Sequence, residues 1–183
     1  MINIPSEFKS NKTLILFLAS IPLLLHLYVN IFAGYGYFRD ELYYIACSNH
    51  LSFGYVDHPP LSVFILKVTT LIFGDSIFAV RLIPAINSAL IVFISCLITL
   101  KLGGKKTAII ISSLSVIFAP VYLAMSGFYS MNSIDILLWS IAFYYIILII
   151  ENNDTKDWII LGIIMGLGLL NKISFLWLGA GLF

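Results

Sequence analysis

The chain has 183 residues, of which 61% are hydrophobic and only 10% are charged. A soluble domain carries about 45–50% apolar and about 25% charged residues, so this composition excludes a soluble globular protein and indicates an all-α integral membrane protein. The net charge of +1 excludes a nucleic-acid partner, which requires a concentrated basic face. Membrane lipid is the expected surrounding. Cys47 lies in a polar stretch and Cys96 in an apolar one, so a structural disulfide is not expected.

The first expected membrane span is residues 13–33, an apolar run of about the 20 residues that a helical crossing requires. Lys9 and Lys12 precede it, as in a signal peptide. The run is longer than the roughly 7–15 residues of a cleavable signal, so we expect an anchor that is retained. A second span is expected at 82–100.

The loop 101–106 carries three lysines, and the positive-inside rule places it, with the N-terminus, on the cytoplasmic side. Two spans between two cytoplasmic ends put residues 34–80 outside, provided that the apolar run 61–74 does not cross. That run is shorter than the about 17–25 residues of a crossing. We therefore expect helices lying in the membrane interface at about 40–50 and 59–73.

Three further apolar runs follow, and spans are expected at about 107–125, 134–150 and 158–183. The last run is interrupted by Lys172, so it is either one tilted span or two half-helices broken at 171–173. Because the chain stops inside an apolar run, we expect it to be the N-terminal part of a longer, C-terminally truncated membrane domain.

The segment 38–61, FRDELYYIACSNHLSFGYVDHPPL, is a polar island in this apolar chain. It holds three of the nine acids, two of the three histidines and an arginine. Lipid cannot solvate such groups, so the segment must lie at the membrane surface or in a protein-lined cavity. Counting crossings places Arg81 and the turn 132–135 on the same outer side, and Lys172 joins them if the last run crosses.

These acids and cations have two plausible purposes. They can form an active site in which a carboxylate takes a proton and cations hold an anionic leaving group, or they can satisfy each other around a loop. Asp40 can equally be an acid at a helix N-terminus. A divalent ion on Asp40, Asp57 and His58 is compatible with the residue types, but their spacing has no regular ligand pattern, and no cofactor is specified.

Four segments in order resemble glycosyltransferase family 39: RDELYYIACSNHLSFGYVDHPPL, FGDSIFAVRLIPA, SMNSIDILLW and GLGLLNKIS. They are similar, respectively, to that family's first outer loop, its link to the second span, its second outer loop and its glycine-rich run ending in lysine. The family uses polyprenyl-phosphate sugars and includes the protein O-mannosyltransferases and the lipid A aminoarabinose transferases. The resemblance covers about residues 34–175 and implies a GT-C-type multi-span helical bundle with interfacial helices in the first outer loop.

The resemblance also implies residue roles. Asp40 corresponds to the general base that deprotonates the acceptor. Arg81 and Lys172 correspond to cations that hold the donor phosphate. The implied substrate-binding residues are Glu41, Tyr55, Asp57, His58 and Asp135.

The activity that the resemblance implies is transfer of a sugar from a polyprenyl-phosphate donor to a lipid, glycan or protein acceptor. It would take place on the outer face of the plasma membrane, by single displacement, with the lipid-linked sugar as substrate rather than cofactor. The alternatives are a non-catalytic membrane subunit, a transporter-like protein or an inactive truncated remnant. Transport residues lie near mid-membrane, whereas Asp40, Asp57 and Asp135 fall in expected outer loops, which favours the transferase.

Overall fold

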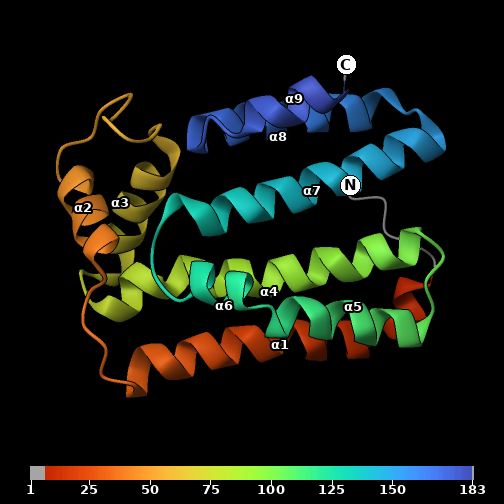
Figure 1. The fold of residues 1–183 in the computed structure, drawn as a ribbon, viewed down its shortest axis with the longest axis horizontal. Helices are drawn as coiled ribbons and strands as arrows, with labels where there is room; N and C mark the ends of the chain where they lie inside the picture. The colour runs from red at the N-terminus through yellow and green to blue at the C-terminus, as the bar shows by residue number, and fades with distance from the viewer. Residues whose placement is uncertain (1–6, 183) are drawn as a thin grey trace.

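The computed structural model describes residues 7–182, and within that part every regular element is an α-helix (Figure 1). The helices are α1 (Phe8–Phe32), α2 (Arg39–Ser48), α3 (Leu61–Phe73), α4 (Ile77–Lys101), α5 (Lys106–Phe118), α6 (Pro120–Ser126), α7 (Met131–Asn152), α8 (Thr155–Asn171) and α9 (Phe175–Leu182). The prediction of an all-α membrane bundle is confirmed, because three of these helices are long and apolar enough to cross a membrane.

The three candidate spans α1, α4 and α7 run alongside one another, with α4 packed against both of the others (Figure 1). One apolar cluster joins α1, α4 and α5, and a second joins α4, α7 and α8. Aliphatic side chains fill both clusters, including Ile15 on α1, Leu97 on α4 and Leu148 on α7, none of which is exposed at all. Helix α4 is therefore the centre of the bundle.

Helix α4 begins at Ile77, five residues before the start predicted at 82. The reason is local, since the Ser76 side chain accepts a hydrogen bond from the Ala79 N–H at 3.2 Å and so caps the helix. Arg81 consequently lies inside the helix and is buried.

The predicted single span at 107–125 is divided into α5 and α6, whose axes differ by 59°. Proline lacks the N–H needed for the intrahelical bond and disfavours helical geometry in the residue before it. Ala119, directly before Pro120, is extended with φ −68° and ψ 121°. The segment expected to form this span is therefore bent, because Pro120 ends α5.

Helices α2 and α3 lie across one end of the bundle, where α1 ends and α4 begins (Figure 1). Helix α3 has 13 residues, which is below the about 17–25 of a crossing. It ends at Phe73, and the following Gly74 has a φ of 80°, a positive value that glycine adopts readily because it has no Cβ.

The C-terminal stretch forms a helical hairpin. After a break following Asn171, α9 turns back along α8, so that the Phe175 ring lies over Gly168 and Met165 reaches Gly179. A Cβ at position 168 would lie only 2.3 Å from that ring. Of the two alternatives for the last apolar run, the described residues up to Leu182 therefore form two helices and not a single tilted one.

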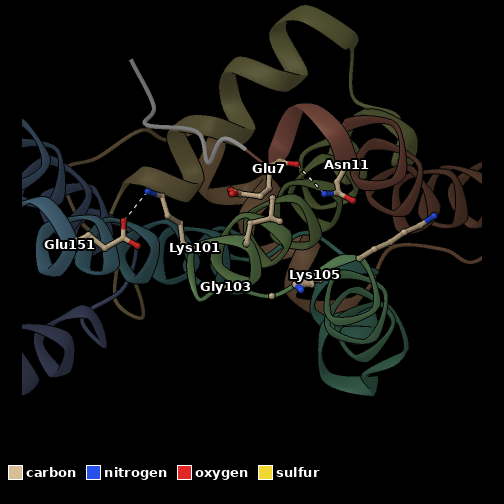
Figure 2. Close-up of a pocket in the computed structure, with 9 residues that line it drawn as sticks. Glu7, Asn11, Lys101, Gly103, Lys105 and Glu151 are labelled. Atoms are coloured by element: carbon tan, nitrogen blue, oxygen red, sulfur yellow. Dashed lines mark hydrogen bonds and ion pairs between the residues drawn. The ribbon is translucent and has the colours of Figure 1, made fainter.

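The opposite end of the bundle carries a cavity of about 550 Å³ between the start of α1, the end of α4 and the start of α5 (Figure 2). Lys101 and Glu151 form an ion pair there at 2.8 Å. The lysine-rich loop 101–106 and the end of α7 therefore share this end, away from α2 and α3.

Candidate functional site

The first turn of α2 contains two neighbouring acids with opposite environments. Glu41 is completely buried, and its Oε2 accepts a hydrogen bond from the Phe38 N–H at 2.8 Å. Glu41 therefore makes the capping hydrogen bond to the start of the helix. Asp40 also lies in the first turn of α2, where a negative charge is favourable to the helix dipole. The side chain of Asp40 is 42% exposed and contacts Arg39 at 3.3 Å, so its carboxylate faces outward.

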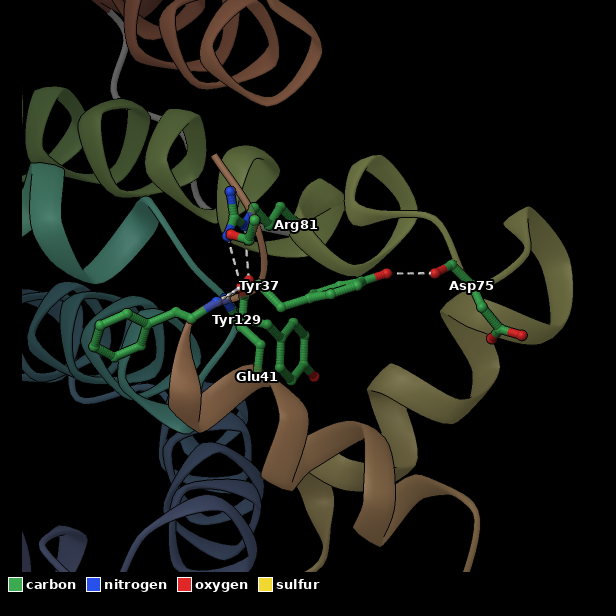
Figure 3. A network of polar contacts seen from close by, with 7 residues as sticks. Tyr37, Glu41, Asp75, Arg81 and Tyr129 are labelled. Atoms are coloured by element: carbon green, nitrogen blue, oxygen red, sulfur yellow. Dashed lines mark hydrogen bonds and ion pairs between the residues drawn. The ribbon is translucent and has the colours of Figure 1, made fainter. Parts of the chain in front are cut away.

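Glu41 forms a bidentate ion pair with Arg81 of α4 (Figure 3). Arg81 Nε donates to Glu41 Oε1 at 2.8 Å and Nη2 donates to Oε2 at 2.6 Å, while Nη2 also donates to the Gly36 carbonyl at 2.9 Å. Burying two charges is costly unless their remaining hydrogen-bonding groups are also satisfied. Here the planar guanidinium matches the geometry of the carboxylate. The Phe38 N–H and the Gly36 carbonyl provide further hydrogen bonds to Glu41 and Arg81, respectively.

The same carboxylate also holds the turn before α7, because the Tyr129 N–H donates to Glu41 Oε1 at 2.9 Å. The Tyr129 hydroxyl, in turn, donates to the Ser62 carbonyl at 2.5 Å. Burial raises the pKa of Tyr129, so its phenol stays protonated as a donor. Glu41 thus joins α2, α4 and the turn before α7, and neither it nor Arg81 is presented to solvent.

His58 lies in a cage of tyrosines and is buried. Its ring stacks on Tyr44, with centroids 4.6 Å apart and planes 6° apart. Tyr43 and Tyr55 approach it at 5.4 Å and 5.2 Å. His58 Nδ1 lies 3.2 Å from the Pro59 carbonyl, whereas its buried Nε2 has no hydrogen-bond partner among residues 7–182.

The loop between α2 and α3 presents Asp57 to solvent while Tyr55 holds the loop together. The Tyr55 hydroxyl accepts from the Ser52 N–H at 2.9 Å and donates to the His50 carbonyl at 3.2 Å. Desolvation, with negative charge from Cys47 and Asp57 adding to it, raises the pKa of Tyr43 to about 12. The Asp57 carboxylate is therefore close to the Tyr43 hydroxyl.

Lys172 lies in the break between α8 and α9 and reaches the start of α7. Its Nζ donates to Asn132 Oδ1 at 2.9 Å and lies 3.6 Å from Asp135 Oδ2. Ser174 Oγ is 3.4 Å from both oxygens of that carboxylate. The side chain of Lys172 is 32% exposed, so this cation remains accessible from outside.

Hydrogen bonds at Met131 connect α2 with the residues at the end of α8. The Tyr44 hydroxyl accepts from the Met131 N–H at 3.1 Å, and Asn171 Nδ2 donates to the Met131 carbonyl at 3.0 Å. The structure therefore brings the candidate residues to one end of the bundle. Sequence reasoning missed three residues that hold this end together, Tyr44, Tyr129 and Asn171, although Tyr44 stands three positions after Glu41 and so shares its helix face.

An apolar groove of about 420 Å³ adjoins these polar groups. Its walls come from the α2–α3 loop, from α3 and from the end of α8, with Leu51, Ser52, Phe53, Pro60, Leu61, Phe64 and Leu170 as lining residues. Pro60 follows His58 by two residues and Leu170 precedes Lys172 by two. The lining of the groove therefore comes within two residues, along the chain, of both His58 and Lys172.

No group of three or more histidine, cysteine or acidic side chains gathers within residues 7–182 in a way that could hold a metal ion. The ligand set considered for a divalent ion, Asp40, Asp57 and His58, is accordingly not assembled there.

The sequence of the chain matches a known protein family. Residues 57–183 match the family described as dolichyl-phosphate-mannose-protein mannosyltransferase. The undecaprenyl phosphate-alpha-4-amino-4-deoxy-L-arabinose arabinosyl transferase of Pseudomonas savastanoi pv. phaseolicola (strain 1448A / Race 6) is 23% identical over 127 residues, which are 67% of this chain and 24% of that protein. The chain therefore spans about a quarter of that relative. No solved structure matches.

The matched segment contains Asp57, His58, Arg81, Asp135 and Lys172 and begins after Asp40 and Glu41. It covers more than half of the chain and includes the central helix, the turn before α7 and the helical hairpin. By this match the chain belongs to the dolichyl-phosphate-mannose-protein mannosyltransferase family of GT-C membrane glycosyltransferases.

Proposed function

We propose that the chain forms the catalytic end of a membrane glycosyltransferase that moves a sugar from a polyprenyl-phosphate donor to a lipid, glycan or protein acceptor. The observation that carries the proposal is a juxtaposition: the outward-facing Asp40, the Asp135–Lys172 pair and an apolar groove lie at the same end of the bundle. Binding of a lipid phosphate requires a cation for the phosphate and an apolar surface for the lipid chain. Activation of the acceptor requires a base that takes its proton.

In this proposal Asp40 is the general base. Its carboxylate is half-exposed, and its only ion-pair partner in the described part of the chain is Arg39, whose own side chain is 91% exposed. Exposed ion pairs of this kind contribute little, with a median of about 0–1 kcal/mol. The carboxylate is therefore free to accept a hydrogen bond from an acceptor hydroxyl or amine and then its proton.

Lys172 holds the donor phosphate. An ammonium group has three N–H donors, and Asn132 and Asp135 engage Lys172 from the side of α7. A further N–H remains for a phosphate oxygen, and the positive charge offsets the charge that develops on the leaving phosphate. Arg81, in contrast, has its guanidinium engaged by Glu41 and Gly36, so we assign Glu41 and Arg81 to holding the site together.

The apolar groove accommodates the polyprenyl chain next to its phosphate. Exposed apolar side chains border it, and Phe53 is fully exposed. A hydrocarbon chain that bound against polar side chains would strip them of water at a cost in free energy. The apolar side chains that line this groove carry no such cost. Asp57 and His58, at the edge of the groove, are then positioned to orient the acceptor or the phosphate.

The reaction is a single displacement. The acceptor oxygen or nitrogen attacks the anomeric carbon while the bond from that carbon to the phosphate oxygen breaks. The acceptor proton passes to Asp40, and the bonding electron pair leaves with the lipid phosphate. Attack opposite to the leaving group inverts the anomeric carbon, and positioning of the two reactants supplies much of the rate enhancement.

A binding experiment separates the phosphate from the lipid. Affinities of the protein in nanodiscs are measured for undecaprenyl phosphate and for undecaprenol, which lacks the phosphate. We expect Lys172→Met to weaken binding of the phosphate at least tenfold and to leave undecaprenol binding unchanged. Lys105→Met, an exposed lysine at the opposite end, is the matched control. Equal affinities of the wild-type protein for the two lipids would remove the donor assignment.

A further inference from the structure

We propose that Tyr44 and Asn171 are positioning residues that set the Asp135–Lys172 pair by holding a single residue, Met131, from two different helices. The catalytic consequence rests on the proposed function, whereas the geometric claim stands without it. Both side chains are buried: Tyr44 is 4% exposed and Asn171 is not exposed at all. Neither reaches the pair directly.

The start of α7 is capped from α2. The first N–H groups of a helix lack partners within the helix. Here the Met131 N–H donates to the Tyr44 hydroxyl at 3.1 Å, and the Asn132 N–H donates to Ser130 Oγ at 3.2 Å. Glu41, one turn before Tyr44 on α2, accepts from the Tyr129 N–H. One buried face of α2 thus receives the backbone of the turn that leads into α7.

The end of α8 holds the same residue from its carbonyl side. Asn171 Nδ2 donates to the Met131 carbonyl at 3.0 Å, and Lys172 Nζ donates to Asn132 Oδ1 at 2.9 Å. Two consecutive residues at the end of α8 therefore bond two consecutive residues at the start of α7. This pairing defines the register between the two segments.

The register decides which side chains meet Lys172. Asn132 and Asp135 are three residues apart and lie on one face of α7, which is the face that Lys172 contacts. A shift of α7 by one residue would turn its side chains by about 100°, since an α-helix has 3.6 residues per turn. Both would then leave Lys172. The hydrogen bonds to the Met131 N–H and carbonyl oppose this rotation of α7.

Tyr44 also links this register to the first outer loop. Its ring stacks on His58, while its hydroxyl accepts from Met131. Burial raises the pKa of Tyr44 and keeps the phenol neutral. One side chain thus holds the start of α7 and at the same time packs on the histidine at the edge of the apolar groove.

A crosslinking experiment tests the geometric claim on the whole chain in lipid nanodiscs. Dicyclohexylcarbodiimide activates a buried carboxylate, and a neighbouring amine then forms an amide, while the carbodiimide takes up the lost water as the urea. The Asp135–Lys172 amide is quantified by mass spectrometry after digestion. We expect Tyr44→Phe and Asn171→Leu each to lower its yield at least threefold. Tyr28→Phe, on an exposed ring that packs against Phe32, should leave the yield unchanged. An undiminished yield in Tyr44→Phe overturns the proposal, because this variant removes one oxygen and keeps the ring.

A double-mutant cycle tests the functional consequence. Tyr44→Phe should weaken undecaprenyl phosphate binding about fivefold, the loss expected for about one hydrogen bond. In a Lys172→Met background the same change should have no effect. Equal losses in both backgrounds would show that Tyr44 acts independently of Lys172 and would overturn the positioning role. If the wild-type protein does not bind undecaprenyl phosphate, the proposed function fails, and the crosslinking yield still decides the geometric claim.

Discussion

Glu41 and Arg81 stand forty residues apart and form a bidentate ion pair from which solvent is excluded. The pair fastens α2 to α4 and, through the Tyr129 N–H, to the turn before α7. Asp40, beside Glu41, is held at a fixed place at the end of the bundle as a result. The orientation of the proposed base therefore depends on the ion pair between Glu41 and Arg81.

Removal of one partner of this pair should be far more damaging than removal of both. Arg81→Met leaves a buried, unpaired carboxylate, and we expect the free energy of unfolding to fall by about 3–5 kcal/mol. The double variant Glu41→Leu/Arg81→Met should recover a large part of that loss. Unfolding in sodium dodecyl sulfate measures both. Arg39→Met is the control, since the Arg39 side chain is 91% exposed; an equal cost for Arg39→Met and Arg81→Met would contradict the structural role.

The α8–α9 hairpin should depend on the absence of a side chain at Gly168. A Cβ there would lie 2.3 Å from the Phe175 ring, so Gly168→Ala should lower the free energy of unfolding by about 1–3 kcal/mol through overpacking. Gly166→Ala is the matched control, because its Cβ would meet no atom within 4 Å. We expect it to be neutral or slightly stabilising. If both variants lower the melting temperature equally, α9 does not fold back on α8 as described.

Features of the fold that depend on neighbouring residues could be predicted from the sequence, whereas contacts between distant segments could not. The spans α1, α4 and α7 were accessible because length and apolarity suffice to identify a crossing helix. Pro120 is a local sequence signal for a bend, and the span expected at 107–125 did not include that bend. The apolar run that forms α3 was also recognisable in the sequence as too short for a crossing.

The interior of the site was not predictable in the same way. The ion pair of Glu41 with Arg81 and the bonds to Met131 join segments that are 40 to 87 residues apart, and no periodicity encodes such contacts. The resemblance to a known family pointed to residues that the structure brings to one end of the bundle. It could not distinguish side chains that face solvent, such as Asp40, from those that hold the structure, such as Glu41.

The two ends of the bundle should lie on opposite sides of the membrane. The positive-inside rule puts the lysine-rich end in the cytoplasm, so α2 and α3 should face outward. In a variant lacking Cys47 and Cys96, a membrane-impermeant maleimide applied to intact cells should label Val56→Cys and spare Leu102→Cys. Both positions are well exposed, at 97% and 71%. Permeabilised cells should show labelling of both, and the reverse pattern in intact cells would invert the proposed topology.

The most direct measurement of the central claim is the release of undecaprenyl phosphate from lipid-linked sugars by the whole protein in proteoliposomes. The substrate is the lipid-linked sugar pool extracted from the source membranes, and the product is quantified by mass spectrometry. With Asp40 as general base, Asp40→Asn should lower the rate by about 10²–10⁴-fold without changing the melting temperature. Asp75→Asn, an exposed acid in the α3–α4 linker, should leave the rate unchanged. Release by Asp40→Asn at the wild-type rate would contradict the account.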